Sequence, residues 1–258
     1  MTLAATGAVA ARLEPESMAD WNTYVAAAES RMQRELDDGR RFLGTDFDDD
    51  AARSRQALLA GELVVGPLHA SDAGGRPLTV RSAAVHHWRG GVFIPGATVT
   101  GIVDALSTTA PPVDRDVLKS TVLERGPGFM RVYLRIQRRK VITVVYNTEH
   151  LVRFRVYGAT RQTSWSTATK IAEVDDPGMP TEHELSVGDD RGFLWKLNAY
   201  WRYELVPGGV IAECESISLS RDVPFVVRAI ASPLVESAAR ESMERTLIAL
   251  RARFSTTR

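Results

Sequence analysis

The sequence predicts an α+β fold in which a curved antiparallel sheet is closed by one long C-terminal helix. Two observations in the last third of the chain carry this prediction. The segment GFLWKLNAYWRYELVPGGVIAECESISLSRDVPF has the pattern of two strands joined by a turn at residues 207–209. The segment SPLVESAARESMERTLIALRARF follows as a single amphipathic helix. Several strands lie upstream with almost no helix between them, and strands that adjoin in sequence favour an antiparallel meander.

The beginning of the chain has a different, helical character. A helix is predicted over residues 17–38, with Ser17 or Asp20 as its N-cap. Its apolar face is expected to contain Trp21, Val25, Ala28, Met32 and Leu36. A charged linker, a short helix over residues 51–60 and a possible short strand from residue 62 follow. We therefore divide the chain into a helical N-terminal extension with a linker, residues 1–80, and a sheet domain, residues 81–258.

The sheet domain is predicted from alternating polar and apolar side chains. The alternation is clean in FMRVYLRIQ and HLVRFRVYG, where arginines share one face of each strand. Strands are expected over residues 83–96, 116–124, 129–138, 141–149, 151–158, 161–173, 193–206 and 209–220. Residues 174–192 form a long polar excursion, and such loops inside a domain are often functional. The closing helix is expected to begin at Ser232 and Pro233 and to bury Leu247 and Leu250.

Composition excludes some classes of function. Among 258 residues 44% are hydrophobic and 25% charged, as in an ordinary globular protein. Lysine plus arginine and aspartate plus glutamate number 32 each, so the formal net charge is zero. Because no field of one sign attracts a polyanion, we expect no nucleic-acid partner. No segment approaches the roughly 20 apolar residues that span a bilayer. A transient contact with a membrane surface is compatible with this composition, and the sequence does not indicate the oligomeric state.

The sequence does not fix the compartment. The first 17 residues are alanine-rich but lack the basic start and long apolar stretch of a signal peptide. We expect a periplasmic or secreted protein if an export signal is missing from this chain, and a cytoplasmic one otherwise. Cys214, the only cysteine, can form no internal disulfide and lies in a strand pattern, where a buried inert thiol is expected.

The C-terminal part resembles a known superfamily. The elements GFLWKL, the strand from GGV, SLSRDVP and the closing helix resemble the START-like, or helix-grip, superfamily over about residues 80–255. That superfamily includes lipid-transfer domains and aromatic polyketide cyclases. The segment from GDDRGFLWKL onward looks like a bacterial branch of it, whose members often carry export signals. The resemblance implies a sheet that grips the helix around one deep pocket. It implies no catalytic residue, because the superfamily has no universal catalytic motif.

Metal and cofactor sites are not indicated. Adjacent His86 and His87 would point to opposite faces of a strand, so one metal ion could not easily bind both. Asp46, Asp48 and Asp50 resemble the start of a calcium loop, but alanine replaces the required glycine and glutamate further on. We expect no metal ion, no cofactor and no catalytic group.

Candidate ligand-binding residues lie on the predicted strands. They are the aromatic residues Tyr133, Tyr146, Trp201 and Tyr203 and the charged residues Arg153, Arg155, Glu213 and Glu215. Ligand pockets are mostly apolar with a few placed polar groups. The alternative is that the aromatic residues only fill the core and that the charged residues form surface ion pairs. Our most specific expectation is that Arg153 or Arg155 faces the interior and pairs with Glu213 or Glu215.

These observations favour a container for a hydrophobic small molecule, such as a lipid. The first alternative is an enzyme of the cyclase or hydrolase kind that uses polar groups in the same cavity. The second is a non-catalytic structural protein whose interior is filled by side chains.

Overall fold

The structure is a computed structural model that describes residues 11–113, 115–139, 143–186, 189–222 and 228–255. Its helices are α1 (Pro15–Leu36), the 3₁₀ helix η1 (Gly44–Phe47), α2 (Ala51–Leu59), α3 (Val99–Thr108) and α4 (Arg228–Phe254). Its strands are β1 (Ala11–Arg12), β2 (Val64–Pro67), β3 (Ala83–Pro95), β4 (Val117–Gly126), β5 (Phe129–Arg139), β6 (Thr143–Val156), β7 (Arg161–Asp175), β8 (His183–Glu184), β9 (Asp189–Asp190), β10 (Lys196–Val206) and β11 (Gly209–Arg221).

One large antiparallel sheet dominates the described part of the chain. It has nine strands in the order β2-β3-β11-β10-β7-β6-β5-β4, with β8 beside β7. The small strands β1 and β9 pair with each other. The meander predicted from sequence accounts for β4 to β7 and for the β10–β11 hairpin, and β3 closes against β11 over its whole length. The fold is therefore the predicted α+β, helix-grip arrangement.

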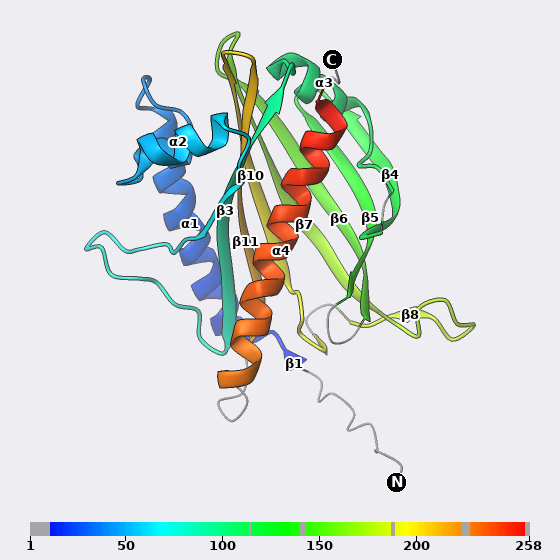
Figure 1. The fold of residues 1–258 in the computed structure, drawn as a ribbon. Coiled ribbons are helices and arrows are strands. Elements are labelled where there is room, and N and C mark those ends of the chain that lie inside the picture. The colour runs from blue at the N-terminus through cyan, green and yellow to red at the C-terminus, as the bar shows by residue number, and fades with distance from the viewer. Residues whose placement is uncertain (1–10, 114, 140–142, 187–188, 223–227, 256–258) are drawn as a thin grey trace.

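The long helix α4 crosses one face of the curved sheet, which we call the inner face (Figure 1). Met243, Leu247 and Leu250 pack there against apolar residues of β3, β10 and β11. Leu247 is fully buried and Leu250 is 9% exposed, which confirms the prediction for this helix. None of the described helices combines the length and apolar character that a membrane span requires.

The opposite, outer face is covered over β3, β11 and β10 by α1, η1 and α2, which we call the N-terminal segment (Figure 1). Trp21, Ala28 and Met32 of α1 are buried with Ile217 and Leu219 of β11. A second cluster joins Phe42, Leu43 and Leu58 to Val206 and Ile211. The predicted apolar face of α1 is largely confirmed. The segment predicted to be a charged linker contributes Phe42 and Leu43 to the hydrophobic core.

Three local predictions were wrong. Helix α1 begins at Pro15, and neither Ser17 nor Asp20 caps it. Instead, Ser17 donates a hydrogen bond to the backbone oxygen of Arg81, and Asp20 accepts one from the Arg81 side chain. One strand, β6, replaces the two expected over residues 141–158, and the irregularity lies instead on β7, opposite Glu149 and His150. Helix α4 begins at Arg228 rather than at Ser232, since residues 228–231 contain nothing that interrupts a helix.

Candidate functional site on the inner face of the sheet

The inner face of β10 carries the aromatic wall that the sequence predicts. Alternation along the strand turns Trp201 and Tyr203 toward α4, where both belong to the apolar cluster around Leu247. Their rings are stacked, with centroids 6.0 Å apart and planes 2° from parallel. Tyr203 is buried, and Trp201 is partly exposed. Phe154 of β6 packs against the same cluster and extends the wall across the sheet.

Neutral polar groups lie within this aromatic wall at two positions along the strands. The first is the pair of hydroxyl groups of Ser164 and Tyr203, whose oxygen atoms lie 3.3 Å apart. The second is His150, whose Nδ1 lies 3.4 Å from Ser166 Oγ and whose Nε2 lies 3.0 Å from Thr148 Oγ1. Burial lowers the pKa of His150 to about 4, so the imidazole is neutral at pH 7.

A third polar level lies at the other end of the inner face, around Tyr146. This side chain is 2% exposed, and none of the described residues forms a hydrogen bond with its hydroxyl. The fully buried Glu173 lies opposite it on β7 and pairs with Arg191, whose Nε is 3.0 Å from a carboxylate oxygen. Burial raises the pKa of both Tyr146 and Glu173. A buried hydroxyl without a partner is costly, and few native structures retain one without a reason.

Sequence reasoning found only part of this set. The sequence predicts Trp201, Tyr203 and Tyr146 as candidates, and all three lie on the inner face. His150 and Ser164 were missed, although alternation in HLVRFRVYG places His150 on the face of Val152 and Phe154. The serines on β7 carry no comparable signal, because a short hydroxyl side chain is common on either face of a strand.

The remaining candidates lie on the outer face, away from α4. Tyr133 donates a hydrogen bond from its hydroxyl to Asn147 Oδ1 at 2.8 Å. Arg153 and Arg155 are exposed, and the guanidinium of Arg155 lies 4.9 Å from the ring centroid of Tyr157.

The expected ion pair between these arginines and Glu213 or Glu215 is wrong. Strand β6 is separated from β11 by β7 and β10. Both sets of side chains project from the outer face, so the curvature of the sheet does not bring them together across the interior.

The two glutamates are buried under the N-terminal segment instead. Glu213 accepts hydrogen bonds from the backbone amides of Gly44 and Thr45, the latter at 2.9 Å. Burial raises the pKa of its carboxyl group, against the nearby charges of Arg89 and Arg202. Glu215 bonds His87 Nε2 at 2.7 Å and pairs with Arg31 of α1.

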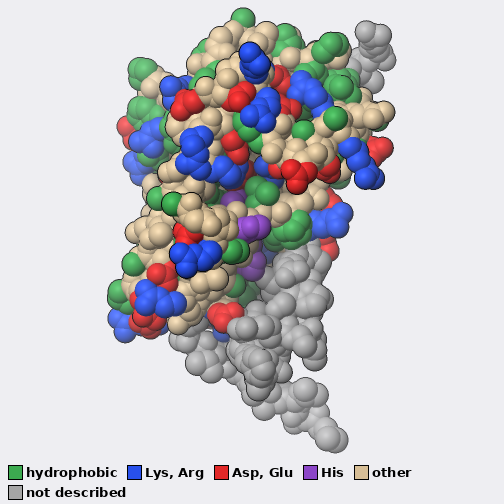
Figure 2. All heavy atoms as spheres, turned by 90° about the vertical axis from the view of Figure 1, so that its left-hand side faces the viewer, with side chains coloured by type: hydrophobic (Ala, Val, Ile, Leu, Met, Phe, Trp, Pro, Cys, Tyr) green, Lys and Arg blue, Asp and Glu red, His purple; other side chains and the backbone are tan. Residues whose placement is uncertain are grey.

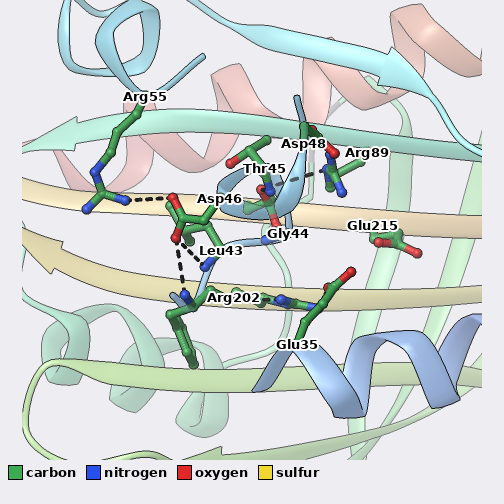
Figure 3. Close-up of polar contacts among 12 residues, drawn as sticks. Glu35, Leu43, Gly44, Thr45, Asp46, Asp48, Arg55, Arg89, Arg202 and Glu215 are labelled. Atoms are coloured by element: carbon green, nitrogen blue, oxygen red, sulfur yellow. Dashed lines mark hydrogen bonds and ion pairs between the residues drawn. The ribbon is translucent and has the colours of Figure 1, made fainter. Parts of the chain in front are cut away.

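Figure 3 shows the polar layer between the N-terminal segment and the sheet. Arg202 of β10 donates to Glu35 at 2.6 Å, and Asp46 accepts from the backbone of Leu43 and from Arg55. Two of the three aspartates that resemble a calcium loop, Asp46 and Asp48, therefore serve as hydrogen-bond acceptors in this layer. Among the described residues no group of three or more histidine, cysteine, aspartate or glutamate side chains could hold a metal ion.

Comparisons with known proteins find similar structures at low identity. No protein-family model matches the chain, and no curated protein matches its sequence. A STAR-related lipid transfer protein from Xanthomonas axonopodis is 15% identical, with a TM-score of 0.36 over 69% of this chain and 99% of that one. The lipid transfer and protein localization domain of human StarD13 is 8% identical, with a TM-score of 0.42 over 82% and 99%.

An aromatase/cyclase, Zhui, from Streptomyces is 14% identical, with a TM-score of 0.33 over 66% of this chain and 93% of that one. At these scores the likeness carries no conclusion about ligand or activity. The assignment of the fold rests on the order and pairing of the strands and on the position of α4.

Proposed function

We propose that the chain binds a hydrophobic, lipid-like small molecule between the inner face of the sheet and α4. The observation that carries this proposal is the composition of the inner face. An apolar and aromatic wall contains a few polar groups, and the hydroxyl of Tyr146 among them is buried without a hydrogen-bond partner in the described part of the chain. Mostly apolar walls with few polar groups are typical of ligand sites.

The spacing of the polar levels favours an elongated ligand. Ser164 and Glu173 mark the two ends of the polar strip along β7, roughly 30 Å apart at about 3.3 Å per residue. A ligand with an oxygen atom near one end and a long apolar body would match this arrangement. Tyr146 would donate to that oxygen, and Trp201 would pack against the apolar body.

Binding is favoured over the cyclase or hydrolase alternative by the state of His150. A general base works best when its pKa lies near the working pH. Burial lowers the pKa of His150 to about 4, so this imidazole is a weak base at neutral pH. It is better suited to donating or accepting a hydrogen bond than to removing a proton. The purely structural alternative would leave the Tyr146 hydroxyl without a role.

The test is native mass spectrometry after gentle purification, followed by titration with a fluorescent fatty-acid probe. We expect a co-purified lipid-like mass and saturable probe binding. Tyr146→Phe keeps the ring and removes the hydroxyl, so it should weaken the binding of an oxygen-bearing probe.

Tyr133→Phe is the matched control, because its hydroxyl lies on the outer face. Absence of any co-purified ligand and of probe binding by the wild type would favour the structural class instead.

A further inference from the structure

A separate depression of about 280 Å³ lies on the outer side of the sheet, where the N-terminal segment meets β7 and β10. It is lined by Arg40, Arg41, Asp46, Ala51, Ala52, Arg55, Arg161 and Glu204. We call it the arginine pocket. Figure 2 shows basic side chains with acidic ones between them on the upper part of this side of the molecule. The pocket does not touch the inner face and plays no part in the function proposed above.

Both carboxylates of the pocket already accept hydrogen bonds on each of their oxygen atoms. Glu204 accepts from Arg161 Nε at 2.9 Å on one oxygen and from Arg55 at 2.8 Å on the other. One oxygen of Asp46 accepts from Arg55 at 3.0 Å, and its other oxygen accepts from the amides of Phe42 and Leu43. These carboxylates therefore hold the guanidinium groups of Arg55 and Arg161 in place. Among the described contacts neither carboxylate accepts a hydrogen bond from the other two arginines of the lining, Arg40 and Arg41.

Donors remain for a further acceptor. No contact among the described residues engages the guanidinium of Arg40, which is exposed at the rim. Arg41 gives one nitrogen to Asp38 at 3.0 Å and lies over the ring of Phe47. Arg55 uses its two terminal nitrogens, one for each carboxylate. A guanidinium carries five N–H donors, so these three side chains retain several.

The start of α2 lines the pocket as well. Ala51 and Ala52 open the helix, and the side chain of the N-cap residue Asp50 makes no capping hydrogen bond. The N-terminus of a helix carries a partial positive charge, and small side chains leave its backbone accessible. Arginine groups and a helix start together form the kind of environment that stabilises an anion with several oxygen atoms.

We propose that the arginine pocket binds a phosphate group, supplied by a free phosphate compound or by a phospholipid headgroup. Arginine matches phosphate oxygens in a bidentate geometry that a single-oxygen or monatomic anion cannot use. A bound phosphate would join the linker and α2 to the ends of β7 and β10. It would therefore stabilise the docked N-terminal segment by mass action.

The first test is calorimetric titration with inorganic phosphate at constant ionic strength, with sodium chloride as the reference salt. The Arg40→Ala/Arg41→Ala variant removes the two arginines that the carboxylates do not hold, so we expect at least about a tenfold loss of affinity. Arg53→Ala is the matched control, because Arg53 is an exposed residue of α2 outside the lining. Phosphate should also raise the unfolding midpoint of the wild type more than chloride does.

The second test separates the two sources of phosphate. Co-sedimentation with phosphatidylcholine vesicles, with and without phosphatidic acid, shows whether a headgroup can enter. Phosphatidic-acid-dependent binding that Arg40→Ala/Arg41→Ala abolishes supports a lipid source, and binding of inorganic phosphate alone supports a free compound.

Two results would overturn the proposal. One is equal stabilisation of the wild type by chloride and phosphate, without a calorimetric signal. The other is an equal loss of affinity in Arg53→Ala, which would mean diffuse surface charge. Tyr146→Phe should leave phosphate binding unchanged, so a failure of this site is distinguishable from a failure of the lipid proposal.

Discussion

Glu213 and Glu215 project from the same face of β11 but are stabilised by different partners. Glu213 is held by backbone amides at the start of η1, whereas Glu215 is held by His87 and by Arg31 of α1. A Cβ atom at Gly44 would lie 2.8 Å from a carboxylate oxygen of Glu213, so the absence of a side chain lets the backbone of η1 approach this carboxylate closely. Each carboxylate therefore fixes a different part of the N-terminal segment.

Glu213→Gln should lower the free energy of unfolding by roughly 1–3 kcal/mol, the usual cost of leaving a buried polar group mismatched. The amide retains one acceptor oxygen and turns an NH₂ group toward a backbone N–H. Chemical denaturation measures the loss. Arg153→Met, at an exposed position, is the control and should stay near wild type. Equal values for both variants would show that Glu213 does not secure η1.

His150 should make the stability of the protein depend on pH. Its pKa is near 6.5 in the unfolded chain and about 4 in the folded state, so the unfolded state binds more protons between these values. Stability is therefore lost as pH falls through this window, by about 2 kcal/mol between pH 7 and pH 5. His150→Gln should lack this loss.

The comparison of these two proteins removes the contribution of Glu173. Burial raises the pKa of Glu173, so its contribution to stability increases as the pH falls, opposite to that of His150. Both proteins contain Glu173, so this contribution cancels in the comparison. Parallel stability curves for wild type and His150→Gln between pH 7 and pH 5 would contradict the neutral, buried imidazole.

At the scale of elements, the contact between α4 and β3 depends on a close approach. A Cβ atom on Gly90 would lie 2.8 Å from Leu247 Cδ1, 2.9 Å from Met243 Cγ and 3.0 Å from Val65. The absence of a side chain at Gly90 lets α4 sit directly on the sheet. Bulk at this position would force the helix away from the strand or strain its side chains.

Leu247→Ala should cost roughly 2–5 kcal/mol, and Gly90→Ala roughly 1–3 kcal/mol. The double variant should lose less than the sum, because the missing leucine atoms make room for the new methyl group. Urea denaturation of the four proteins gives the coupling energy. Ile248→Ala is the control on the exposed side of α4, with 47% of the isoleucine accessible. Strict additivity would mean that α4 does not pack on Gly90 as described.

Sequence periodicity was enough to predict the sheet and α4 because each strand and the helix carry the pattern of their own buried face. The position of the arginines could not be predicted in the same way. Arg153 and Arg202 both alternate with apolar residues, yet Arg153 is exposed and Arg202 is buried against Glu35. The difference comes from the N-terminal segment, which covers β10 and not β6. That cover is a tertiary contact between residues far apart in sequence.

At the scale of the whole molecule, the outer face is divided into a covered part and an open part. The N-terminal segment covers β3, β11 and β10, and the exposed arginines lie on β6. Strand β2 belongs to the same sheet although it lies within residues 1–80. The boundary drawn at residue 80 thus separates two kinds of sequence but passes through the large sheet.

A chain that begins at Glu62 would expose the apolar residues that the N-terminal segment covers. They are Val206, Ile211, Ile217 and Leu219. It would also remove the two backbone amides that donate to Glu213 and the Arg31 guanidinium that pairs with Glu215. We expect this shortened chain to aggregate or to lack a cooperative thermal transition, as followed by circular dichroism and size-exclusion chromatography. A soluble monomer with a wild-type transition would establish the sheet domain as an independent unit.

The alternation along β11 has a consequence for any comprehensive mutational scan of this strand. Ala212 and Cys214 belong to the cluster around α4, whereas Glu213 and Glu215 bind the N-terminal segment. In a selection for ligand retention, substitutions should be tolerated least at Ala212 and Cys214. In a selection for phosphate-dependent thermal resistance, they should be tolerated least at Glu213 and Glu215, so the two tolerance profiles alternate along the strand. Alternate residues of the same strand would then be constrained by two different functions, and each set would be detected only by the assay for its own function.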